Sequence, residues 1–273
     1  MNPIDRKPLK ERAKELIGIA QPPVWQVTLI FLLATTWVST VFDLFNPIVR
    51  SVEEWYQTLY AAAIAGDMNA IYGGQAAIRQ IFLSPAGYTT ILLNVIIGLY
   101  IVVVNYGYNS YSLGVVRLQN PDQSELFSRV YLAGKIILAE VLQVIFVYLW
   151  SLLLVIPGFI AVYRYRMIVY ILLDDPDCSV WEAFRRSKAL MKGRKWELFV
   201  LDLSFLGWII LAGAASNLVS GILPGVVGTV VGTAVATACY CFLQPYQSFT
   251  YAQWYEAIRP QTEAQPEETG DFY

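Results

Sequence analysis

Four charged residues lie inside long apolar stretches of the sequence, and they are the residues most able to carry chemistry. They are Glu140, Arg164, Arg166 and Asp202. A charge inside the hydrocarbon region of a membrane costs about 3 kcal/mol by insertion scales, so such charges commonly mark functional sites. Counting about 1.5 Å per helical residue places all four in the cytoplasmic half of the membrane. We therefore expect them to form one polar site that opens to the cytoplasm.

Two classes of function fit these four charges. The arginines could hold a phosphate or carboxylate headgroup bidentately, so that the protein binds or translocates an amphiphile or lipid-like molecule. Alternatively, the carboxylates and guanidiniums only neutralise one another, which is typical of a structural ion-pair network in a membrane assembly or accessory protein. An intramembrane enzyme with Glu140 and Asp202 as its acid-base pair is a third class. We do not favour an enzyme, because only carboxylates and hydroxyls are available for chemistry.

Four uncharged polar residues could complete the site. Tyr163 and Tyr165 flank Arg164, and Asn105 and Asn109 lie one helical turn apart on an earlier apolar segment. Their hydroxyl and amide groups can donate and accept hydrogen bonds to a ligand. An aromatic belt at the inner headgroup level is the alternative explanation for the tyrosines.

The composition excludes several other functions. The chain contains no histidine and only three cysteines, Cys178, Cys239 and Cys241, in no metal-binding pattern. We therefore expect neither a metal nor another cofactor. The net charge of −2 argues against a broadly basic surface that binds nucleic acid. The expected partners are membrane lipids and an amphiphilic ligand.

The same composition predicts a membrane protein. Of the 273 residues, 56% are hydrophobic and 15% are charged, whereas about a quarter are charged in an ordinary soluble domain. Several apolar runs reach the roughly 20 residues that cross a bilayer as a helix. We expect an all-α bundle, a single transmembrane domain over residues 1–259, with about six spans. They are predicted at residues 24–45, 88–118, 136–156, 159–173, 198–222 and 226–258.

Four of the segments outside these spans have features of their own. Residues 1–23 and 174–197 combine basic residues with apolar residues at helical spacing, which predicts amphipathic interfacial helices on the cytoplasmic side. Residues 47–87 are expected to form an extracytoplasmic cap that Gly73-Gly74 divides into two short helices. Residues 260–273 are acidic and nearly free of aliphatic side chains, which is typical of a disordered tail.

The basic residues orient the bundle, because loops rich in lysine and arginine stay in the cytoplasm. Only Arg50 and Arg79 fall outside in the six-span topology. Pro157-Gly158 favours a tight reversal between the third and fourth spans. One kinked span over residues 136–173 would instead place the basic cluster at residues 185–195 outside. Both termini are therefore expected in the cytoplasm.

Small residues recur every four positions in the last span, at Gly228, Gly232 and Ala236. Such spacing lets two helix backbones approach closely. We expect this face to pack within the chain rather than against a second copy, because five neighbouring spans compete for it.

Several motifs together resemble a bacterial membrane-protein family, the domain of unknown function 975. The residues that carry the resemblance are Ile156-Pro157-Gly158, Asp174-Asp175-Pro176, Ser187 with Met191-Lys192-Gly193, the string from Leu201 and Asp202 to Trp208, Pro245-Tyr246 and Thr250-Tyr251-Ala252. The likeness covers most of the chain but neither residues 47–87 nor the tail. It implies a six-helix protein of the bacterial plasma membrane. The family in turn resembles the membrane domain of some glycerophosphodiester phosphodiesterases, which hints at lipid-related work but transfers no catalytic residue.

Overall fold

The structure is a computed structural model of the chain, and it describes residues 4–67, 69, 79–223 and 225–259. These residues form helices and connecting turns with no β-strand, so the predicted all-α fold is confirmed. The predicted break at Gly73-Gly74 and the acidic tail at residues 260–273 lie outside the described residues. Pro224 also lies outside the described residues. Gly225 beside it adopts a positive φ of 57°, which is consistent with the predicted turn.

Six helical segments are long and apolar enough to cross a membrane, which indicates a multi-pass membrane protein. Their helices are α2 (Val24–Leu32) with the π-helical turn η1 (Leu33–Trp37) and α3 (Val38–Phe45), α6 (Pro85–Val116), α8 (Ala133–Leu153), α9 (Val155–Tyr165) with α10 (Ile168–Asp174), α12 (Lys195–Ile222) and α13 (Gly225–Ile258).

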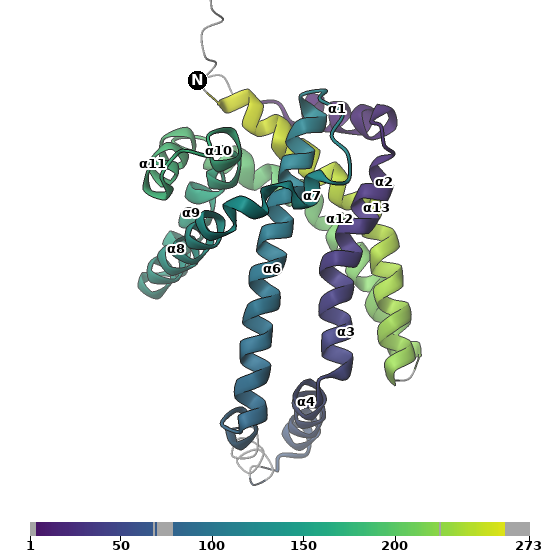
Figure 1. Cartoon of the computed structure of the whole chain (residues 1–273). Coiled ribbons are helices and arrows are strands. Elements are labelled where there is room, and N and C mark those ends of the chain that lie inside the picture. The colour runs from purple at the N-terminus through teal and green to yellow at the C-terminus, as the bar shows by residue number, and fades with distance from the viewer. Residues whose placement is uncertain (1–3, 68, 70–78, 224, 260–273) are drawn as a thin grey trace, which may run out of the picture.

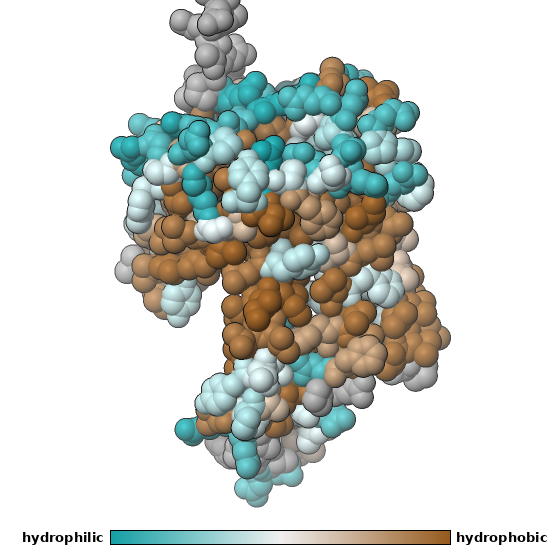
Figure 2. Space-filling model, in the orientation of Figure 1, coloured by the Kyte–Doolittle hydropathy of each residue, from teal (hydrophilic) through white to brown (hydrophobic). Residues whose placement is uncertain are grey.

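The remaining helices lie at the two ends of the bundle. They are α1 (Arg6–Ile19), α4 (Pro47–Ala65), α7 (Glu125–Ser128), the 3₁₀ turn η2 (Arg129–Leu132) and α11 (Val180–Leu190). Figure 1 shows α1, α11 and the end of α13 at one extremity, which we call the basic end, and α4 at the other. In Figure 2, hydrophilic residues cover the basic end, and a broad hydrophobic band lies below them.

The buried side chains of the chain are concentrated at the basic end. In α6, Val104, Tyr108 and Tyr111 are almost fully buried, whereas Leu92 and Val95, nearer the start of the helix, are more than half exposed. Apolar side chains exposed in this way are stable when lipid covers them. The far half of the bundle therefore relies on the bilayer, while the basic end is packed much like a soluble domain.

The hairpin of α8 and α9 reverses three residues earlier than expected. The extended residue between the helices is Leu154, with φ −162° and ψ 149°, whereas Pro157 and Gly158 both lie inside α9. Proline is tolerated in the first turn of a helix, because the N–H groups there have no intrahelical partner. The prediction of a turn at Pro157-Gly158 was thus wrong in position. The hairpin itself is present and returns α11 to the end that holds α1 (Figure 1).

Helix α9, the second arm of this hairpin, is short. Helix α9 has 11 residues, which is about 16 Å of helix. The segment that follows, α10, contributes the buried residues Ile168, Ile171 and Leu172 to the core of the basic end. Accordingly, Figure 1 shows the hairpin ending well before the far end of α6.

The small residues of α13 pack within the chain, as expected. An added Cβ on Gly228 would lie 2.2 Å from the carbonyl oxygen of Leu223, and one on Gly232 would lie 1.9 Å from Oγ of Ser220. The hydroxyl of Ser216 donates a hydrogen bond of 2.9 Å to the carbonyl oxygen of Gly232. This face of α13 therefore holds α12 at close range.

Candidate functional site

Asp202 is held by two tyrosines from two other helices. Its Oδ1 accepts a 2.8 Å hydrogen bond from the hydroxyl of Tyr251 on α13. Its Oδ2 accepts a 3.0 Å hydrogen bond from the hydroxyl of Tyr163 on α9. Hydrogen bonds to a charged carboxylate are strong, so they fix the side chain and join α9, α12 and α13 at one point. Each carboxylate oxygen retains lone-pair capacity for a further donor.

Arg166 contacts the aromatic ring of Tyr251. It occupies the break between α9 and α10, and its Cζ is 5.0 Å from the centroid of the Tyr251 ring. Such an arrangement is a cation-π interaction, in which the ring face attracts the guanidinium. Within the described part of the chain, Arg166 forms no ion pair with a carboxylate.

These residues line a cavity of about 500 Å³, which we call the Asp202 pocket. Asn109 of α6 joins Arg166 and Asp202 in its wall, and its Oδ1 also accepts a 3.3 Å hydrogen bond from the hydroxyl of Tyr170. Apolar side chains of α12 complete one side. The polar lining comprises Asn109, Arg166, Asp202, Gln244, Gln247, Ser248 and Tyr251.

Four polar residues of this lining, all on α13, were not among the site residues predicted from the sequence. Gln244, Gln247 and Ser248 share the face of α13 that carries Tyr251. Their spacing of three, four and seven residues is itself a sequence signal, because positions i, i+3, i+4 and i+7 lie on one face of a helix. The predicted uncharged site residues, Asn105, Asn109, Tyr163 and Tyr165, all lie on other segments. Burying an amide in an apolar span also costs free energy unless it is hydrogen-bonded, so the glutamines of α13 could have been predicted on the same ground.

Four of the expected residues do not reach the pocket. Glu140 on α8 is half-buried, is absent from the pocket lining and forms no ion pair with an arginine of the described residues. Arg164 places its Cζ 5.7 Å from the Trp150 ring, and its Nε is buried without a hydrogen-bond partner. Asn105 lines a separate cavity beside η1.

Tyr165 also lies elsewhere, in an aromatic cluster. Its ring centroid is 5.0 Å from that of Phe184 on α11 and 6.0 Å from that of Phe146 on α8. Neighbouring residues on a helix point in directions about 100° apart, so Tyr163 and Tyr165 cannot both face α12. The structure thus brings together Asp202, Arg166, Tyr163 and Asn109. It separates them from the other four predicted residues.

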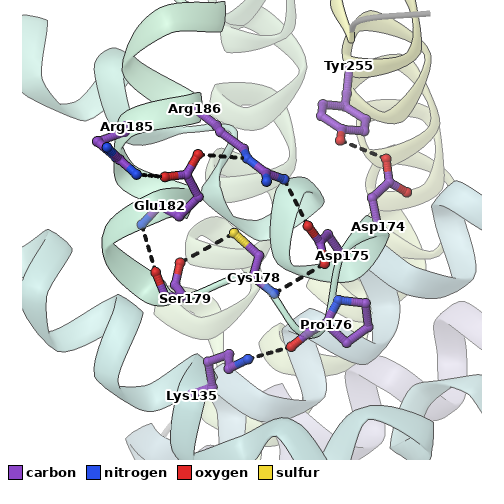
Figure 3. Close-up of polar contacts among 10 residues, drawn as sticks. All are labelled: Lys135, Asp174, Asp175, Pro176, Cys178, Ser179, Glu182, Arg185, Arg186 and Tyr255. Carbon is purple, nitrogen blue, oxygen red and sulfur yellow. Dashed lines mark hydrogen bonds and ion pairs between the residues drawn. The ribbon is translucent and has the colours of Figure 1, made fainter. Parts of the chain in front are cut away.

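The turn between α10 and α11 carries a network of polar contacts. Asp175 Oδ1 accepts a hydrogen bond from the N–H of Cys178, and its Oδ2 accepts a 2.9 Å bond from Arg186 (Figure 3). The ammonium of Lys135 donates to the carbonyl oxygen of Pro176. Hydrogen bonds from Arg186 and Arg185 lower the pKa of Glu182 below its usual value. Helix α11 is therefore anchored to α8 and α10 rather than only resting on a membrane surface.

A second charged cluster closes the basic end. Nη2 of Arg117, just after α6, lies 2.6 Å from Oδ1 of Asp174 and 2.7 Å from Oε1 of Glu256. Arg259 lies 2.7 Å from Oε2 of Glu256, and the Tyr255 hydroxyl donates a 2.7 Å bond to Oδ2 of Asp174. We call these five residues the Arg117 cluster. It ties the ends of α6, α10 and α13 together.

Comparison with known proteins gave one match. The family model described as "Protein of unknown function (DUF975)" matches residues 86–262, a region that includes every residue of the Asp202 pocket. No curated protein and no solved structure matched the chain. The similarity to the membrane domain of glycerophosphodiester phosphodiesterases therefore stays a prediction.

Proposed function

Because the chain belongs to the DUF975 family, whose description states no activity, we propose a function from the geometry of the site: the Asp202 pocket binds the polar headgroup of a membrane amphiphile. The observation that carries this proposal is the guanidinium of Arg166, which lines a 500 Å³ cavity and lies over a tyrosine ring. A half-buried cation without a carboxylate partner gains from an anion that can form charge-assisted hydrogen bonds. A phosphate or carboxylate headgroup has this chemistry.

The rest of the lining suits the neutral part of such a headgroup. Amides of Asn109, Gln244 and Gln247 offer both donors and acceptors, and Asp202 has acceptor capacity left. Leu203 and Leu206 on the same wall are apolar and exposed. They offer a surface against which the start of an acyl chain can pack. The alternative of a purely structural ion-pair network has less support, because Arg166 forms no ion pair with Asp202 or with any other carboxylate of the described residues.

We place this site in the cytoplasmic half of a bacterial plasma membrane. The support is the positive-inside rule, since α1 and α11 bring their cations to the same end of the bundle (Figure 1). Lys188 is exposed on α11. In a variant whose three cysteines are serines, Lys188→Cys should resist an impermeant thiol reagent in intact cells and react after the membrane is opened. Labelling of this cysteine in intact cells would show that the site lies on the extracytoplasmic side instead.

The headgroup proposal can be tested with one anionic lipid and its uncharged counterpart. Phosphatidic acid should raise the Tm of the detergent-purified protein more than diacylglycerol with the same chains. Arg166→Gln should weaken phosphatidic acid binding about 10-fold, because a charge-assisted hydrogen bond contributes about 1.5 kcal/mol or more. Arg166→Lys should retain part of the effect.

Lys192→Gln is the matched control, because Lys192 is an exposed cation away from the pocket. It should leave phosphatidic acid binding unchanged. The proposal fails if Arg166→Gln, with a Tm near that of the wild type, binds phosphatidic acid as well as the wild type does.

A further inference from the structure

A second cavity lies on the other face of the α12–α13 pair. It has a volume of about 410 Å³, and we call it the Lys14 groove. Ala212 and Ala215 line it from α12, while Trp208 and Phe242 at its sides are 60% and 71% exposed. The Asp202 pocket uses the opposite faces of the same helices, and the two cavities share no lining residue. An apolar groove that opens to the hydrocarbon region suits a hydrocarbon chain.

Helix α1 lies across the basic end of this groove. Arg6, Lys10 and Lys14 recur every four residues, so they follow one face of α1. Nη1 of Arg6 donates a 3.5 Å hydrogen bond to the carbonyl oxygen of Val200 on α12. Nζ of Lys10 lies 4.2 Å from the centroid of the buried Phe205 ring. Lys14 lines the groove itself.

These three cations are not paired with a carboxylate in the part of the chain that the structure describes. Glu15 on the same helix pairs with Arg12 instead. Burial, together with the nearby charges of Arg6 and Lys14, lowers the pKa of Lys10. Like charges held at this spacing repel one another, and an anion between them would relieve that repulsion.

We propose that the Lys14 groove is a binding site for one anionic phospholipid, with an acyl chain along Ala212 and Ala215 and the phosphate between Lys10 and Lys14. Charge and shape both favour this occupant. The ammonium groups lie at the polar end of an apolar groove, which is the order of phosphate and chain in a phospholipid. Attraction of an anionic lipid to surface cations contributes about 1 kcal/mol for each Lys or Arg.

The test compares phosphatidylglycerol with phosphatidylcholine of the same chain length. Native mass spectrometry of the purified full chain should show about 30-fold stronger retention of phosphatidylglycerol, from two lysines at about 1 kcal/mol each. The double variant Lys10→Gln/Lys14→Gln should lose this preference. The control Lys7→Gln/Lys188→Gln removes the same net charge from exposed positions outside the groove and should keep it.

A second pair of variants tests the groove itself. Ala215→Phe should reduce retention of both lipids by filling the cavity, whereas Ala214→Phe, one residue away and outside the lining, should not. Equal retention of the two lipids by the wild type would overturn the proposal. So would an equal loss in both lysine doubles, or in both phenylalanine variants. The preference should persist in Arg166→Gln, which separates this site from the Asp202 pocket.

Discussion

Replacing Gly107 with alanine is expected to lower the free energy of unfolding by about 3 kcal/mol, the upper end of the cost of overpacking. The added Cβ would lie 1.8 Å from the carbonyl oxygen and 2.5 Å from the carbonyl carbon of Leu126. These are backbone atoms of α7, and Leu126 is itself 1% exposed. No side-chain rotation can relieve the clash, so α6 and α7 would have to separate. The Tm of the purified protein should fall by about 10 °C.

Gly98→Ala is the matched control for Gly107→Ala. Gly98 lies on the same helix, and an added Cβ there meets nothing within 4 Å. Alanine has the higher helix propensity by about 1 kcal/mol, so this variant should be as stable as the wild type or more stable. Equal Tm values for the two variants would show that α6 and α7 do not approach as closely as described.

Removing the guanidinium of Arg117 should produce the second large loss of stability, about 2 kcal/mol. Arg117→Met keeps the apolar stem but removes one of the two cations that Asp174 and Glu256 share, at 2.6 and 2.7 Å. Arg259 stays 3.7 Å from Asp174 and 2.7 Å from Glu256. Breaking a fully buried ion pair costs about 3 to 5 kcal/mol. The side chains here are 21% to 24% exposed, so the cost is reduced. The Tm should fall by about 6 °C.

Arg185→Met provides the comparison for Arg117→Met. The Arg185 side chain is 79% exposed and pairs with Glu182 one turn earlier on α11. Exposed pairs of this kind contribute about 0.5 kcal/mol or less, so its Tm should stay within about 2 °C of the wild type. A similar fall in both variants would mean that the Arg117 cluster contributes no more than an ordinary surface ion pair.

The membrane fold could be predicted from the sequence because a transmembrane helix is identified by the average hydropathy of about 20 residues. One or two atypical residues change that average little. All six spans follow that average, including the sixth, predicted at residues 226–258 and found at Gly225–Ile258. The turn of the α8–α9 hairpin is a local property of a few dihedral angles. Pro157 and Gly158 favour a turn by type, yet the first turn of α9 accommodates both.

The candidate site was predicted in part for a similar reason. Depth along a helix follows from residue number, so Arg166 and Asp202 were placed correctly at one level. The direction of a side chain depends on how each helix is rotated against its neighbours, and residue number does not set that rotation. Glu140 therefore lies outside the pocket lining, and Tyr165 packs against Phe184.

The short α9 has a consequence for the lipids around it. A hydrocarbon core is about 30 Å thick, whereas α9 supplies about 16 Å of helix before α10 enters the packed basic end. Figure 2 shows the molecule hollowed below this hairpin. A bilayer meets such a mismatch by bending and thinning locally, at a cost of a fraction of a kcal/mol per ångström. We expect the leaflets to approach each other there, which shortens the route of any headgroup that crosses.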